Sequence, residues 1–190
     1  MSIRRAMIPA RSATAFSLLV LAAATVVAAD AGLDATHSTV VATFKQEGVA
    51  VDGPFHAFSG VIHFDPAKPT AATAAIDVQT ASFDIGDPAY NAEVAKPAWL
   101  DSGHYPQATF RSTAIKVLGP GKLEATGTLT LKGRALAITV PITQAGSGAK
   151  GTFDGSLAIS RKAFGIGDAT WDDVLDDKVV VRFHVVGSQP

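Results

Sequence analysis

Apolar and polar residues alternate in eight segments of the chain, and turn-forming residues separate these segments. A period of two is typical of a β-strand with one buried face, because successive side chains point to opposite faces of a sheet. In FHAFSGVIHF, for example, Phe58, Ile62 and Phe64 share one side. The predicted strands span residues 38–45, 55–64, 72–83, 107–118, 122–131, 134–143, 152–160 and 178–186.

Short turns join most of these segments, among them Lys132-Gly133 and a Val-Asp-Gly-Pro turn before the second strand. Consecutive strands with short connections run antiparallel. Eight such strands most simply close into a barrel, because closure removes the exposed edges of the sheet. We therefore predict an all-β, eight-stranded antiparallel up-and-down barrel. A two-sheet sandwich is the alternative.

The connection between the third and fourth predicted strands is the longest, and it contains the one mature segment with a helical pattern, YNAEVAKPAWL. Ala89 to Lys96 can form two helical turns, and Pro97 would end them. Loops of this length in compact domains are usually functional or disordered. We predict a short helical insert across an open end of the barrel, after which Pro106 begins the next strand.

The first 29 residues have the features of a signal peptide. Three arginines precede an apolar run that contains FSLLVLAAATVV, and small residues follow it up to Ala29. We expect cleavage before Asp30, which leaves a single domain over residues 30–190 that is exported to the periplasm. An uncleaved anchor in the inner membrane is the alternative, although the apolar run is short for a membrane span.

Composition narrows the function further. The 190 residues have a formal net charge of -1, so the chain lacks the basic excess of a nucleic-acid-binding protein. The sequence has no cysteine and five histidines, none in an HxH or HxxxH spacing, so no disulfide and no metal site are predicted. No serine has a nucleophile-elbow context. We predict a protein that is not an enzyme, with no catalytic residues and no cofactor.

Small residues stand among the large ones on the apolar strand faces, including Ala42, Gly60, Ala74, Ala108 and Gly127. An eight-stranded barrel is just wide enough to be filled by side chains or to hold one small ligand. Small residues that point inward would leave room, whereas alternate small and large residues also suit a filled barrel. The pattern alone leaves both a hollow and a packed interior open.

Five pieces of the chain, in order, resemble the YceI-like family of bacterial secreted proteins: VDGPFHAFSGVIHFDPAKP, IDVQTASFDIGD, AWLDSGHYPQATFRST, GTLTLKG and ISRKAFGIGDATWDD. The resemblance covers Leu33 to Gly187 and is most specific at Pro106, Phe110 and Ser112. It implies a lipocalin-like barrel whose elongated hydrophobic cavity holds a polyisoprenoid or another long amphiphile. A periplasmic role in lipid binding or carriage follows from the same resemblance.

The helical insert departs from the family pattern. Many members carry a charged, histidine-containing helix where this chain has YNAEVAKPAWL. The version seen here looks like a subgroup often found beside membrane b-type cytochromes, which hints at a quinone-like ligand. The alternative function is an accessory module that docks on such a cytochrome or serves a stress response, and a lipid hydrolase or isomerase is a third class. Family members are often dimers, so the resemblance also carries the expectation of a homodimer.

An isoprenoid tail needs no acid, base or metal, because burial of apolar surface at about 25 cal/mol per Å² is enough to hold it. Aromatic residues at the mouth can offer a ring to the lipid and, in tryptophan, an N–H to water. The predicted lining residues are Phe44, Phe58, Ile62, Ile76, Val78, Phe110, Leu129, Phe153 and Phe183, and the predicted mouth residues are Trp99, Phe164 and Trp171.

Overall fold

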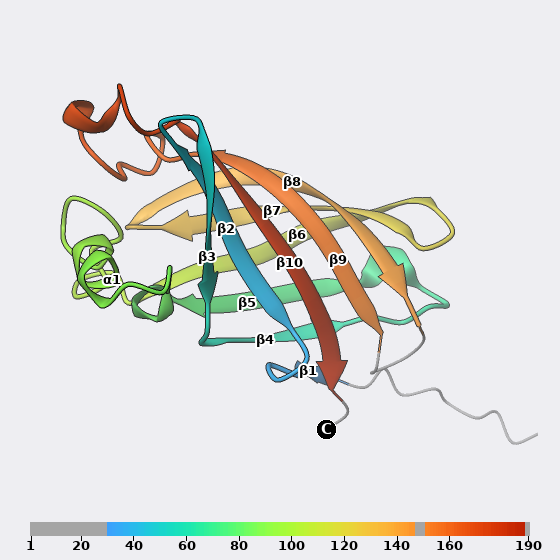
Figure 1. Ribbon diagram of the computed structural model, residues 1–190. Helices are drawn as coiled ribbons and strands as arrows, with labels where there is room; N and C mark the ends of the chain where they lie inside the picture. The colour runs from blue at the N-terminus through green and yellow to red at the C-terminus, as the bar shows by residue number, and fades with distance from the viewer. Residues whose placement is uncertain (1–29, 147–150, 189–190) are drawn as a thin grey trace, which may run out of the picture.

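A computed structural model describes residues 30–146 and 151–188, so the predicted signal peptide lies outside the described residues. Within these residues, ten strands form one antiparallel sheet that wraps into a barrel (Figure 1). The strands are β1 (Asp30–Leu33), β2 (Thr39–Gln46), β3 (Val49–Phe55), β4 (Phe58–His63), β5 (Thr73–Gln79), β6 (Gln107–Gly119), β7 (Lys122–Leu131), β8 (Arg134–Ala145), β9 (Thr152–Ser160) and β10 (Lys178–Ser188).

Strand β1 closes the barrel, because it pairs with β4 on one side and with β10 on the other. Strands β4 to β10 follow one another around the ring, each antiparallel to the next. The closed ring therefore contains eight strands, which confirms the predicted antiparallel barrel and excludes the sandwich. The hairpin of β2 and β3 extends the same sheet, since β2 pairs with β10 beside the stretch that β1 occupies.

The predicted turn before the second strand is wrong, because Val-Asp-Gly-Pro lies inside β3. The turn lies earlier, at Glu47 and Gly48, whose φ angles of 51° and 78° suit a two-residue hairpin. Gly53 is required in β3 because a Cβ atom there would lie 2.1 Å from the ring of Phe83. The glycine that resembles a turn signal thus serves close packing, and β4 begins only at Phe58.

The predicted helix between the third and fourth strands is present as α1 (Pro88–Val94), in the connection from β5 to β6. The carboxylate of Asp87 caps its start by accepting hydrogen bonds from the backbone N–H groups of Ala89 and Tyr90, at 2.8 Å and 3.3 Å. The helix lies at the same end of the barrel as the connection from β9 to β10, residues 161–177 (Figure 1). A hydrogen bond of 2.8 Å from the Gly167 N–H to the Ala98 carbonyl joins the two connections.

Two buried apolar clusters lie at different positions along the barrel. One contains Ile62, Phe153 and Val185, and the other contains Leu100, Leu131 and Phe164. The second cluster draws Leu100 from the helical insert and Phe164 from the β9–β10 connection, so it closes the barrel at their end. Across residues 30–146 and 151–188, no helix is long and apolar enough to cross a membrane.

Candidate ligand-binding cavity

An apolar cavity of about 170 Å³ lies inside the barrel. Among its described lining residues, all but Thr73 and Thr109 are apolar. The interior is therefore hollow in part, which resolves the alternative that the sequence left open. An apolar cavity of about 150 Å³ can hold benzene, so this volume suits one isoprene-sized group and falls below the roughly 300–1,000 Å³ of common ligand pockets.

Seven of the residues predicted to contact ligand line this cavity: Ile62, Ile76, Val78, Phe110, Leu129, Phe153 and Phe183. The strand register explains why they meet. Ile76 is paired with Phe110 and Phe110 with Leu129, so these three side chains form one inward row across β5, β6 and β7. The predicted residues Phe44, Phe58, Trp99, Phe164 and Trp171 are not part of the lining. Contact of any of the twelve with a ligand stays a prediction.

Glycines on the inward face make room for neighbouring side chains rather than for the cavity. A Cβ atom at Gly127 would lie 2.4 Å from the Arg111 carbonyl oxygen and 2.6 Å from the ring of Phe110, and one at Gly60 would lie 2.6 Å from both the Ala75 carbonyl oxygen and Cδ1 of Ile76. Real Cβ atoms do not approach that closely, so these glycines let a backbone carbonyl and a large side chain come close to the strand. The expectation that small inward residues create empty space is therefore only partly right.

Aliphatic residues complete the lining, and the sequence analysis did not select them. Strand β8 contributes Ile138, Val140 and Ile142, which alternate with outward residues as a period of two requires. Their signal was present in the strand pattern. Alternation alone does not show which inward residues of a strand border the cavity.

The end of the barrel near α1 is closed by Phe164, which is only 1% exposed. The structure places this ring against Leu100 and Leu131 rather than at an open mouth. Trp99 and Trp171 contact each other edge to face, with ring centroids 5.0 Å apart. The three predicted mouth residues thus belong to the connections that close this end.

A buried arginine fixes the connection that carries Phe164. Arg161 is 3% exposed, and its guanidinium group donates to the Asp172 carboxylate at 2.8 Å. The same group donates to the backbone carbonyls of Leu175, Ile166 and Asp176 at 3.1–3.2 Å. A buried charge is tolerated when it is paired and fully hydrogen-bonded. Arg161 therefore holds residues 161–177 in the shape that seats Phe164, a role that sequence reasoning missed.

Charge pairing stabilises the same connection at its surface. Hydrogen bonds from Lys162, and then from Arg161, lower the pKa of Asp172 below its usual value. Lys132 donates to the Gly165 carbonyl at 2.6 Å and Arg134 to the Ala163 carbonyl at 2.9 Å. The turn between β7 and β8 is thereby attached to the β9–β10 connection.

Ser112 has a structural role. Strand β6 is irregular between Ser112 and Ala114, and the Ser112 hydroxyl accepts a hydrogen bond of 2.8 Å from the Ala74 N–H. The residue thus completes the β5–β6 pairing where the ladder stops. In the part of the chain that the structure describes, no group of three or more His, Cys, Asp or Glu residues is arranged to hold a metal ion.

A closed antiparallel barrel around an apolar cavity defines a class of small-ligand-binding β-barrels, of which lipocalins are one example. The YceI-like domain model matches residues 32–187. The chain therefore belongs to the YceI-like family, as its sequence resemblance indicated.

Similar proteins agree with this assignment. The crystal structure of BcnA from Burkholderia cenocepacia has a TM-score of 0.78 and 46% identity, and the match covers 81% of this chain and 98% of that one. A UPF0312 protein of Shewanella sp. (strain W3-18-1) is 33% identical over 159 residues, which is 79% of this chain and 82% of the relative. A polyisoprenoid binding domain from Saccharophagus degradans has a TM-score of 0.68 at 18% identity, covering 85% of this chain and 99% of that domain. At that identity the likeness concerns the fold alone.

Proposed function

We propose that the protein binds or carries a polyisoprenoid, or a similar long amphiphilic lipid, with part of the tail in the barrel cavity. The observation that carries the proposal is the cavity lining, in which Thr73 and Thr109 are the polar members among the described residues. Among the described residues, such a lining offers no charged group to a polar ligand and no acid or base that could activate the two threonine hydroxyls. This favours binding over catalysis. A neighbour of the same fold is a polyisoprenoid binding domain, which supports the choice of ligand class.

The size of the cavity limits how the lipid is held. Micromolar affinity corresponds to about 8 kcal/mol, which requires roughly 330 Å² of buried apolar surface before the costs of binding are counted. One isoprene-sized group does not supply that area. Either the interior widens when the tail binds, or further parts of the lipid contact the protein outside the cavity.

The finer features of the proposal come from the family resemblance. A quinone is a candidate ligand, and an accessory role beside a membrane b-type cytochrome or in a stress response is the second candidate function. The observation that favours the second is the helical insert, YNAEVAKPAWL, which lacks the histidine and most of the charge of other members. Periplasmic location is proposed from the signal-peptide pattern, and a homodimer stays a prediction.

Mass spectrometry of lipid extracted from the purified mature protein tests the proposal. We expect an isoprenoid or prenylated quinone at a fixed stoichiometry, and we expect lipid-stripped protein to take up geranylgeraniol. Protein that is purified empty and binds no prenyl compound would contradict lipid binding. If that empty protein captures a b-type cytochrome from detergent-solubilised membranes, the accessory role is favoured instead.

A further inference from the structure

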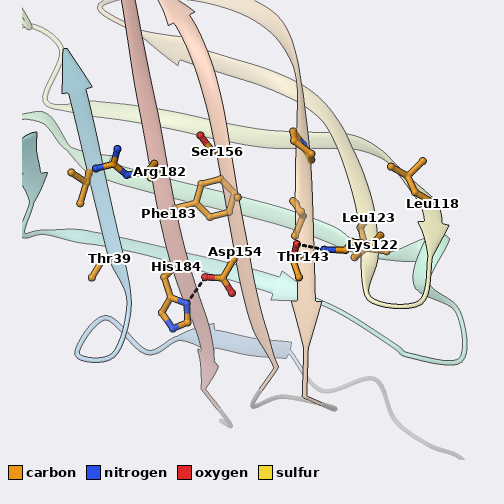
Figure 2. A pocket seen from close by; sticks show the side chains of 14 residues that line it. Thr39, Leu118, Lys122, Leu123, Thr143, Asp154, Ser156, Arg182, Phe183 and His184 are labelled. Atoms are coloured by element: carbon orange, nitrogen blue, oxygen red, sulfur yellow. Dashed lines mark hydrogen bonds and ion pairs between the residues drawn. The ribbon is translucent and has the colours of Figure 1, made fainter. Parts of the chain in front are cut away.

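A second hollow, of about 630 Å³, lies on the outer face of the barrel. Its wall contains an outward row that crosses five strands, because Thr39 pairs with His184, His184 with Asp154, Asp154 with Thr143, and Thr143 with Lys122. Figure 2 shows this row, with the His184 ring hydrogen-bonded to the Asp154 carboxylate at 2.6 Å. We call this hollow the outer groove.

Residues whose side chains face inward also belong to the lining of the outer groove. Leu123, Ile142 and Phe183 contribute to the outer groove and to the inner cavity alike. These three belong to the neighbouring row of the sheet, in which Phe183 pairs with Gly155, Gly155 with Ile142, and Ile142 with Leu123. Where a sheet is continuous, side chains of one face do not reach the other face. The outer groove and the inner cavity therefore lie against the two faces of the same row of the sheet.

The β8–β9 ladder stops at this row. Within the described residues, β8 and β9 share four paired positions, the last being Ile142 with Gly155, whereas β9 and β10 share nine. The next residue of β8 is Pro141, which has no N–H to donate to a ladder. Gly155 adds no side chain, and the ring of Phe183 lies 2.3 Å from where its Cβ atom would be. We call the place where the ladder ends, between Pro141 and Ser156, the slit; the Phe183 ring lies over Gly155 beside it.

The charges around the outer groove differ in their partners. Arg182 is paired with the Asp52 carboxylate at 2.9 Å, and His184 with Asp154. Lys122 donates instead to the hydroxyl of Thr143 at 2.9 Å, which leaves its positive charge uncompensated by that contact. A cation with a neutral partner favours a ligand oxygen that accepts hydrogen bonds.

From these observations we infer that the slit is a lateral portal. The lipid tail passes the Phe183 ring into the inner cavity, and a head with acceptor oxygens, a phosphate or a quinone carbonyl, stays in the outer groove beside Lys122. The inference rests on the proposed lipid-binding function. It explains how a lipid binds although the inner cavity is small, because the outer groove adds the contact area that one isoprene-sized group cannot supply. Entry of the tail through the end of the barrel near α1 is hindered by buried Phe164 and Leu100, which close that end.

A bulky residue placed beside the slit tests the route. Ser156 is exposed at the slit and lines the outer groove, whereas Ala158 is exposed two residues further along the same face of β9 but does not line it. For Ser156→Trp we expect association and dissociation of geranylgeranyl phosphate to slow by about tenfold each, with a smaller change in Kd. For Ala158→Trp we expect both rates to stay at their wild-type values.

Stopped-flow fluorescence on lipid-stripped mature protein gives these rates, and circular dichroism confirms that each variant is folded. Wild-type rates in Ser156→Trp, with binding retained, would overturn the portal and leave the proposed function standing. Equal slowing in both variants would also overturn the portal. Failure of the wild type to bind the probe would remove the proposed function and the portal together.

A second substitution tests where the head lies. We expect Lys122→Gln to weaken binding of geranylgeranyl phosphate by about tenfold if the head is anionic. Weakening confined to a prenylated benzoquinone would identify a carbonyl head instead. Unchanged Kd values for both probes would show that the head does not lie in the outer groove.

Discussion

Filling the inner cavity should abolish binding of the lipid tail without unfolding the barrel. Ala108 lines the cavity on β6 and is paired with Val78, another lining residue. Because an apolar cavity of about 150 Å³ accommodates a benzene ring, the phenyl group of Ala108→Phe fits within the 170 Å³ that is present. Burial of the ring offsets the 1–3 kcal/mol that overpacking commonly costs, so we expect the free energy of unfolding to change by less than about 1.5 kcal/mol.

The loss of affinity can be estimated from the excluded group. An isoprene unit has five carbons, and at about 0.8 kcal/mol for each buried carbon its exclusion removes roughly 4 kcal/mol, or about a thousandfold in Kd. Titration of lipid-stripped protein with geranylgeraniol measures this change. Ala137→Phe is the matched control, since Ala137 is exposed on β8 and precedes the lining residue Ile138. A Kd for Ala108→Phe within about tenfold of the control would refute a tail held in this cavity.

Substitutions at three further positions test the surrounding structure. Phe164→Ala should lower the free energy of unfolding by about 3–5 kcal/mol in urea denaturation, and Phe164→Leu by less than about 1.5 kcal/mol, because the ring is buried. Asp172→Asn should lower Tm by leaving buried Arg161 without its carboxylate. The pKa of Asp172 is lower in the folded than in the unfolded protein, so its carboxylate stabilises the fold fully above about pH 4, near the unfolded pKa, and this stabilisation is lost as pH falls through the folded pKa. The difference in Tm between the wild type and Asp172→Asn should follow the same pH dependence. Gly127→Ala should displace both the Arg111 carbonyl and the Phe110 ring and weaken prenyl binding in the same titration, whereas an unchanged Kd would show that this close approach does not shape the cavity.

The strand pattern predicted most of the strands because the alternation of side chains is local, and the short turns predicted their antiparallel order. It failed at β3, where Gly53 and Pro54 resemble a turn and the need for glycine comes from the distant ring of Phe83. Strand β1 was missed because it is only four residues long, too short to show a period. Errors of this kind follow from contacts between residues far apart in the sequence.

The site was predicted in part for a similar reason. Inward direction follows from alternation, so Phe110 and Phe183 were correctly placed on the inner face. Depth along the barrel does not follow from alternation, and Phe164 was therefore assigned to a mouth although it closes the end near α1. Arg161 could not be recognised, because a buried guanidinium group is explained only by the carbonyls that the folded connection brings to it.

The end of the inner cavity near α1 and the slit differ in how easily they can open. Near α1, Phe164 is held by the Arg161 hydrogen bonds and by the attachment of Lys132 to Gly165, so opening that end requires several polar contacts to break. At the slit, by contrast, the ladder has already ended and the ring of Phe183 lies beside it. A rotamer change of one ring breaks no backbone hydrogen bond, whereas local unfolding breaks several and takes roughly microseconds to seconds. Lipid exchange through the slit should therefore proceed with the barrel folded, and its rate should depend on the side chain at position 183 far more than on global stability.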